Sequence, residues 1–133
     1  MPDEPYEFLR SVQLFTDVSD KDLQTIAVSM RRRAFAPGER IVAEGEGGVG
    51  FFFVETGTAS VTQDGERRAT LGPGDHFGEL ALISERERSA TVTAKTEVRA
   101  LEIPFWDFRD FAHANPDVTW KLLQHVVALI QPA

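Results

Sequence analysis

Hydrophobic and polar residues follow three successive patterns along the chain, which predict helices, then strands, then helices. Ser19 is expected to cap the start of a helix, because an acidic residue, Asp22, follows it three positions later. The apolar residues of this helix then recur at helical spacing, at Leu23, Ile26, Ala27 and Met30. The arginines 31–33 are interpreted as a solvated helix end, where cations complement the helix dipole.

Residues 34–103 consist of short stretches that are rich in β-branched and aromatic residues and separated by glycine and proline. Such stretches favour strands. Asp64-Gly65, between two of them, is typical of a tight hairpin. Short strands at regular spacing predict a mainly β fold, which is a sandwich, a barrel or a jelly roll. The expected strands are residues 40–43, 51–55, 59–63, 67–71, 90–94 and 98–103.

The pattern returns to helical spacing in residues 104–131. Pro104 suits a first helical turn, and Asn115-Pro116 predicts that a second helix begins there with Asn115 as its cap. This last helix carries two apolar stripes, one sufficient to dock on the sandwich and a second that favours a partner such as another copy of the chain. A helix wholly buried in its own domain is the alternative. The stripes are Val118, Leu122, Val126 and Leu129, and Trp120, Leu123, Val127 and Ile130.

Composition narrows the class of protein. A chain of 133 residues is one domain's worth, and its net charge of −7 argues against a surface that binds DNA directly. There is no cysteine, which excludes disulfides, thiolate metal sites and thiol nucleophiles. No apolar run reaches membrane-spanning length, and the acidic N-terminus is unlike a secretion signal. We therefore expect a soluble, cytoplasmic protein of bacterial style with no membrane contact.

The segment between the expected strands 67–71 and 90–94 carries the candidate chemistry. Gly78 permits close backbone approach, and residues 79–82 favour one turn of helix. The unpaired N–H groups of such a turn attract an anion. Arg88 adds a fork of donors suited to phosphate, and Ser89 adds a hydroxyl. Glu79 is then free to accept from a sugar hydroxyl, so the segment is expected to recognise a small nucleotide.

Residues 77–92 resemble the phosphate-binding cassette of cyclic nucleotide-binding domains, which occur in bacterial catabolite-activator regulators, regulatory subunits of cAMP-dependent protein kinase and cyclic-nucleotide-gated channels. The similarity extends over nearly the whole chain. It implies a double-stranded β-helix (jelly-roll) sandwich (34–103, cassette 77–91), with N-terminal helices (1–33) and two C-terminal helices (104–131). The other matching motifs are Leu14-Phe15, Val18-Ser19, Asp22-Leu23, Pro37-Gly38-Glu39, Glu44-Gly45-Glu46, the Phe51-to-Gly57 strand, Gly72-Pro73-Gly74-Asp75 and Arg88-Ser89-Ala90.

The resemblance also implies a role for each cassette residue. Arg88 would pair with the cyclic phosphate, and Glu79 would accept from the ribose 2′-hydroxyl. Arg86 is the competing arginine, but the Ser-Ala that follows Arg88 favours Arg88. We expect cAMP as the ligand, with cGMP left open because relatives with a hydroxyl at the position of Ser89 differ in the base they take. Backbone and side-chain groups that would line the phosphate and sugar come from Gly78, Leu80, Ala81, Ser89 and Ala90.

The implied function is a non-catalytic regulatory sensor that switches its C-terminal helices and acts on a fused or separate effector domain. One alternative is a domain of the same fold that has lost its ligand and serves as an interaction or dimerisation module. A cupin-type metal enzyme is less well supported, because the three histidines are expected to lie far apart. No catalytic residue, metal or cofactor is expected. The histidines are His76, His113 and His125.

Overall fold

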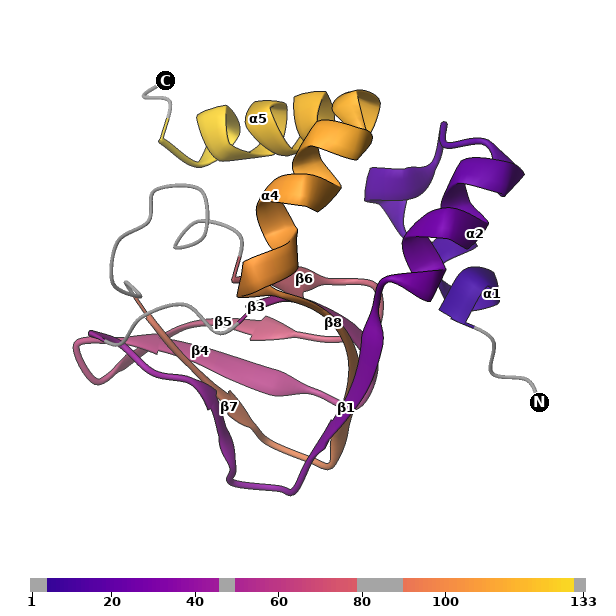
Figure 1. The fold of residues 1–133 in the computed structure, drawn as a ribbon. Helices are drawn as coiled ribbons and strands as arrows, with labels where there is room; N and C mark the ends of the chain where they lie inside the picture. The colour runs from indigo at the N-terminus through magenta and orange to yellow at the C-terminus, as the bar shows by residue number, and fades with distance from the viewer. Residues whose placement is uncertain (1–4, 46–49, 79–89, 131–133) are drawn as a thin grey trace.

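Two four-stranded antiparallel sheets form a sandwich in the computed structural model, which describes residues 5–45, 50–78 and 90–130 (Figure 1). One sheet has the strand order β1-β8-β3-β6, and the other has the order β2-β7-β4-β5. The mainly β sandwich with flanking helices is therefore confirmed. The strands of the first sheet are β1 (Arg31–Phe35), β8 (Val98–Pro104), β3 (Gly50–Thr56) and β6 (His76–Phe77), and those of the second are β2 (Arg40–Val42), β7 (Thr91–Ala94), β4 (Ala59–Gln63) and β5 (Glu66–Leu71).

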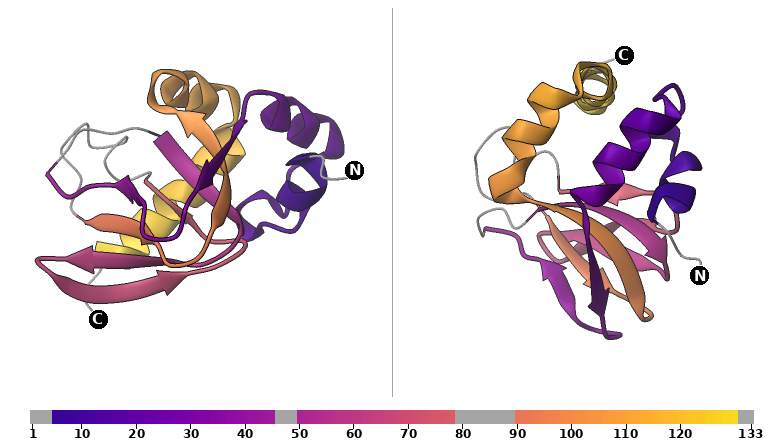
Figure 2. Two further views of the ribbon diagram at one scale, coloured as in Figure 1. Left: turned by 90° about the horizontal axis from the view of Figure 1, so that it is seen from below. Right: turned by 45° about the vertical axis from the view of Figure 1, so that its right-hand side comes forward.

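The helices lie together on the outer face of the β1-β8-β3-β6 sheet, as Figures 1 and 2 show. Two of them, α4 and α5, follow the sandwich directly, as expected for the C-terminal part of the chain. Within the described residues, no helix is long and apolar enough to cross a membrane. The helices are α1 (Pro5–Arg10), a short 3-10 helix (Gln13–Phe15), α2 (Asp20–Val28), α4 (Phe105–Ala114) and α5 (Pro116–Ile130).

Strand β3 contributes to two hydrophobic cores. Because side chains alternate along a strand, Phe51 and Phe53 pack toward the helices, while Phe52 and Val54 pack between the two sheets. All four side chains are fully buried. An almost unbroken apolar run is the pattern of a strand covered on both faces, which is what β3 is in this fold.

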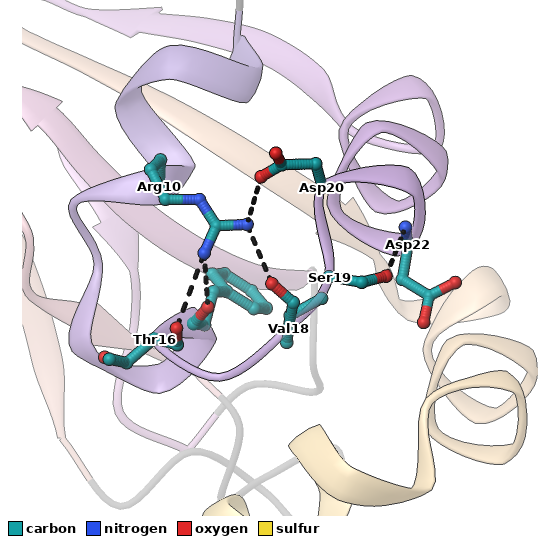
Figure 3. Close-up of polar contacts among 7 residues, drawn as sticks. Arg10, Thr16, Val18, Ser19, Asp20 and Asp22 are labelled. Carbon is teal, nitrogen blue, oxygen red and sulfur yellow. Dashed lines mark hydrogen bonds and ion pairs between the residues drawn. The ribbon is translucent and has the colours of Figure 1, made fainter.

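Side-chain caps and a tight network of donors fix the N-terminal helices (Figure 3). The Asp22 N–H donates to the Ser19 hydroxyl at 3.1 Å, which confirms Ser19 as the cap of α2. Arg10 donates to the carbonyl oxygen of Val18 at 2.8 Å and pairs with Asp20 at 3.2 Å. These contacts hold the end of α1 against the start of α2.

The arginines 31–33 do not lie at a helix end, so that interpretation is wrong. Helix α2 ends at Val28, and all three residues belong to edge strand β1. Nε of Arg31 and Nη1 of Arg33 both donate to Oε1 of the fully buried Glu102, at 2.9 and 2.8 Å. A buried carboxylate needs such partners, and two cations from the neighbouring strand supply them.

Gly50 lies directly beside this carboxylate, and we expect Gly50→Ala to lower the free energy of unfolding by about 1–3 kcal/mol. An added Cβ would collide with Oε2 of Glu102 and lie 2.9 Å from the carbonyl oxygen of Ile103. Gly72→Ala is the matched control, since nothing lies within 4 Å of its added Cβ. Urea denaturation of both variants checks this; equal stabilities would contradict it.

Turn and helix boundaries follow the sequence closely elsewhere. Asp64 and Gly65 have φ of 55° and 82°, as a tight hairpin turn between β4 and β5 requires. Helix α5 begins at Pro116 as predicted. The side chain of Asn115, however, donates to the carbonyl oxygen of Phe111 at 2.8 Å. It therefore stabilises the end of α4, and its predicted role as the side-chain cap of α5 is replaced by that contact.

The two stripes of α5 have different environments. Val118 and Leu122 of the first stripe are buried in the core beneath the helices. Trp120, Leu123 and Val127 of the second stripe are exposed. The alternative of a helix wholly buried in its own domain is thus wrong, and α5 presents an apolar face to the outside of this chain.

Candidate functional site

The candidate cassette connects the two sheets of the sandwich. It leaves β6, which pairs with β3, and it leads into β7, which pairs with β2 and β4. Gly78 has a φ of 100°, a conformation that favours glycine, and Ala90 is half-buried just before β7. The structure therefore places Gly78 and Ala90 at the two ends of this connection. The other predicted ligand-binding residues lie outside the described residues: Glu79, Leu80, Ala81, Arg88 and Ser89.

Aromatic packing anchors the strand that leads into the cassette. Phe77 is paired with Phe52 across the sheet, and their rings stack at a centroid distance of 5.0 Å with 12° between planes. Phe52 is fully buried, so Phe77 packs against a side chain of the core between the sheets. Strand pairing and core packing therefore fix the residue that precedes Gly78.

Polar contacts fix the strand that leaves the cassette. The Glu44 N–H donates to the Thr91 hydroxyl at 2.9 Å, and Oε1 of Glu44 accepts from the Asp64 N–H at 3.2 Å. Glu44 thus ties the end of β2 to the first residue of β7 and to the β4–β5 turn. Val92, the next residue of β7, is buried between the sheets. Both ends of the cassette are therefore attached to well-packed strands.

A pair of histidines joins the strand before the cassette to the C-terminal helix. His76 of β6 and His125 of α5 meet edge to face, with ring centroids 4.9 Å apart. His76 also contacts the ring of Phe51, at 5.4 Å. The expectation that the histidines are far apart is wrong for this pair, because the fold brings α5 back over β6. His113 lies exposed on α4.

An open cleft of about 620 Å³ lies beside the histidine pair. Lys121 of α5 spans it and pairs with Asp17 at 3.2 Å. Among the described residues, no group of three or more histidine, aspartate or glutamate side chains is placed to hold a metal ion. The cleft thus lies between α5 and the N-terminal segment, and the Lys121–Asp17 ion pair connects the two across it, while the His76–His125 contact connects α5 to β6.

Sequence reasoning missed both the histidine contact and the Glu102 cluster. The Glu102 cluster did leave a signal: a glutamate between Leu101 and Ile103, in the strand expected at 98–103, needs cationic partners if that strand is buried. The arginines 31–33 are candidates for these partners, although nothing in the sequence shows that the two segments are neighbours. The histidine contact left none, because it depends on the angle at which α5 folds back.

The two-sheet fold, the helices on one face and the connection between β6 and β7 together define a class of domain. A profile of the family described as "Cyclic nucleotide-binding domain" matches residues 32–115. The chain belongs to the cyclic nucleotide-binding domain family.

Named relatives share this domain within longer proteins. The chain is 40% identical over 94 residues to the cAMP-dependent protein kinase regulatory subunit of Yarrowia lipolytica, covering 69% of this chain and 25% of that protein. It is 34% identical over 118 residues to Glutaminase 2 of Bradyrhizobium diazoefficiens, covering 88% of this chain and 19% of that protein. The chain thus spans a quarter or less of the length of these relatives.

Solved structures agree in fold. The regulatory domain of Toxoplasma gondii PKA with cAMP matches with a TM-score of 0.78 and 28% identity, covering 91% of this chain and 49% of that one. The Thermus thermophilus Catabolite Activator Protein matches with a TM-score of 0.81 and 26% identity, covering 89% of this chain and 58% of that one. The regulatory subunit of a cAMP-independent protein kinase A from Trypanosoma cruzi, bound to guanosine, matches with a TM-score of 0.79 and 26% identity. This match covers 92% of this chain and 44% of that one.

Proposed function

We propose that this domain binds a cyclic nucleotide, cAMP in the first place, and acts as a regulatory sensor without catalysis. One observation carries the proposal: Gly78-Glu79-Leu80 and Arg88-Ser89-Ala90 occur in the connection between β6 and β7 of a chain of this family. The similarity to the Toxoplasma gondii PKA regulatory domain solved with cAMP and to a cAMP-dependent protein kinase regulatory subunit supports the choice of ligand.

The cassette residues would divide the ligand between them. Arg88 would pair with the cyclic phosphate, because a guanidinium offers two parallel donors to phosphate oxygens. Glu79 would accept from the ribose 2′-hydroxyl. The positive φ of Gly78 supports a sharp turn at the start of this segment, which lets backbone N–H groups approach an anion.

The switch would run from the cassette to the C-terminal helices. His76 lies two residues before Gly78 and contacts His125 of α5. A movement of the cassette toward bound phosphate would therefore change the position of α5 on the sheet. The surface that α5 presents to an effector would change with it. The effector would be fused to this domain or separate, and the domain would act in the cytoplasm.

The exposed stripe of α5 favours a second function, protein interaction through this helix. Trp120, Leu123 and Val127 are spaced three and four positions apart and therefore share one face. A second copy of the chain would cover this face by pairing α5 with α5. If the cassette has lost its ligand, this interaction would be the domain's main activity.

Thermal unfolding tests ligand binding. We expect cAMP at 100 times its dissociation constant to stabilise the folded chain by about 2.7 kcal/mol, because it binds the folded state only. The midpoint of unfolding should rise by several degrees with cAMP and stay unchanged with 5′-AMP, which lacks the cyclic phosphate. Equal midpoints with and without cAMP would favour the interaction module.

A further inference from the structure

An arginine of the sandwich contacts the first turn of helix α4. The guanidinium of Arg31 lies over the ring of Trp106, 5.2 Å from its centroid. Trp106 is 59% exposed, and its ring also meets Phe105, which is itself 53% exposed. Burial therefore does little to position this tryptophan, and the contact with Arg31 links it directly to the sheet.

Arg31 is itself fixed by a buried carboxylate. Its Nε donates to Oε1 of Glu102, a side chain with no exposed surface in the middle of β8. The carboxylate of Glu102 lies against Gly50, where an added Cβ would collide with it. The chain of contacts thus begins at a fully buried side chain of the sheet and ends on the helix.

Arg33 provides a natural comparison on the same strand. It donates from Nη1 to the same oxygen of Glu102, at 2.8 Å, and its guanidinium lies 5.2 Å from the centroid of the Phe35 ring. Phe35 belongs to β1 itself, so this second contact stays within the sheet. The two arginines share one carboxylate and one type of ring contact, but only the contact of Arg31 reaches α4.

The geometry of the two contacts favours arginine over lysine at position 31. A planar guanidinium can donate from its edge to a carboxylate while its face lies on an aromatic ring. A lysine ammonium is a compact charge that can pair with Glu102 but has no face to place on Trp106. Arg33 donates to Glu102 from one terminal nitrogen, which a lysine can imitate.

We infer that Arg31 is a positioning residue that sets the angle of α4 on the sandwich. Helix α4 leads into α5 through Asn115, so this angle also decides where α5 lies. In so far as nucleotide binding moves these helices, which rests on the proposed function, the Arg31–Trp106 contact biases the equilibrium between their two positions. It thereby tunes the nucleotide affinity of the domain.

The angle of α4 can be measured without any nucleotide. The chain has no cysteine, so Lys95→Cys and His113→Cys, both at exposed positions, would carry the only two spin labels. We expect Arg31→Lys to displace or broaden the distance distribution between the labels, and Arg33→Lys to leave it as in the parent. Trp106→Leu keeps the ion pairs of Arg31 and Arg33 with Glu102 and removes only the ring, so it should change the distance distribution in the same way as Arg31→Lys. A parent-like distribution in both Arg31→Lys and Trp106→Leu would overturn the positioning role.

Titration with cAMP then tests the tuning. Arg31→Lys should change the dissociation constant by about twofold to fivefold, in line with a partly exposed cation–π contact, and Arg33→Lys should not. If both variants and the parent bind cAMP with the same dissociation constant, the Arg31–Trp106 contact does not tune nucleotide affinity. Absence of binding by the parent chain would instead contradict the proposed function and the tuning that rests on it, and the label distances would still decide whether Arg31 positions α4.

Discussion

Arg88→Ala is expected to weaken cAMP binding by about 2–5 kcal/mol, or about 30-fold to about 5,000-fold in the dissociation constant. The proposed site pairs Arg88 with the cyclic phosphate, and alanine would leave that charge without its main partner. Titration calorimetry of the variant and the parent measures the difference. The circular dichroism spectrum of the variant should match that of the parent, because the substitution removes a contact with the ligand and leaves the fold intact.

Arg86→Ala is the matched control for this prediction. Arg86 lies two positions earlier in the same charged run, Glu85-Arg86-Glu87-Arg88, and its removal changes the net charge equally. We expect a dissociation constant within about twofold of the parent value, as for a solvent-screened charge. Exchanged effects, with Arg86→Ala losing affinity and Arg88→Ala keeping it, would show that the wrong arginine was assigned to the phosphate.

The second large effect is expected at Phe51, where alanine should lower the free energy of unfolding by about 3–5 kcal/mol. The side chain is fully buried, and its ring lies 4.5 Å from Phe53, 5.4 Å from His76 and 5.8 Å from Phe108. It thus joins β3 to the strand before the cassette and to α4. The cavity left by alanine would loosen all three.

Urea denaturation measures this loss, with Phe105→Ala as control. Phe105 is the same residue type but is 53% exposed, so its removal should cost less than about 1 kcal/mol. Similar costs for the two substitutions would mean that the core beneath α4 tolerates the cavity, and the described packing of Phe51 would be wrong.

The sandwich could be predicted from sequence because its signals are local. The Asp64-Gly65 turn, the Ser19 cap and the start of α5 at Pro116 each depend on residues within a few positions of one another. The strands are likewise found within one residue of the expected bounds wherever they were expected. Two short strands were missed. Arg31–Phe35 reads as charged because it is an edge strand, and His76–Phe77 is too short to show alternation.

Contacts between distant segments could not be predicted in the same way. The pairing of Glu102 with Arg31 and Arg33 depends on β1 and β8 being neighbours, which no local pattern reveals. The contact of His76 with His125 depends on how α5 returns over the sheet. The roles of Glu79 and Arg88 came from chemistry and resemblance, and they remain predictions because both residues lie outside the described part of the chain.

Titration calorimetry of the purified chain with cAMP, followed by cGMP, tests the central claim most directly. We predict saturable heat with cAMP at about one site per chain, and a weaker or absent response to cGMP, on protein whose folded state is verified beforehand. No heat with either nucleotide would contradict the sensor and would leave the exposed face of α5 as the basis of the domain's function.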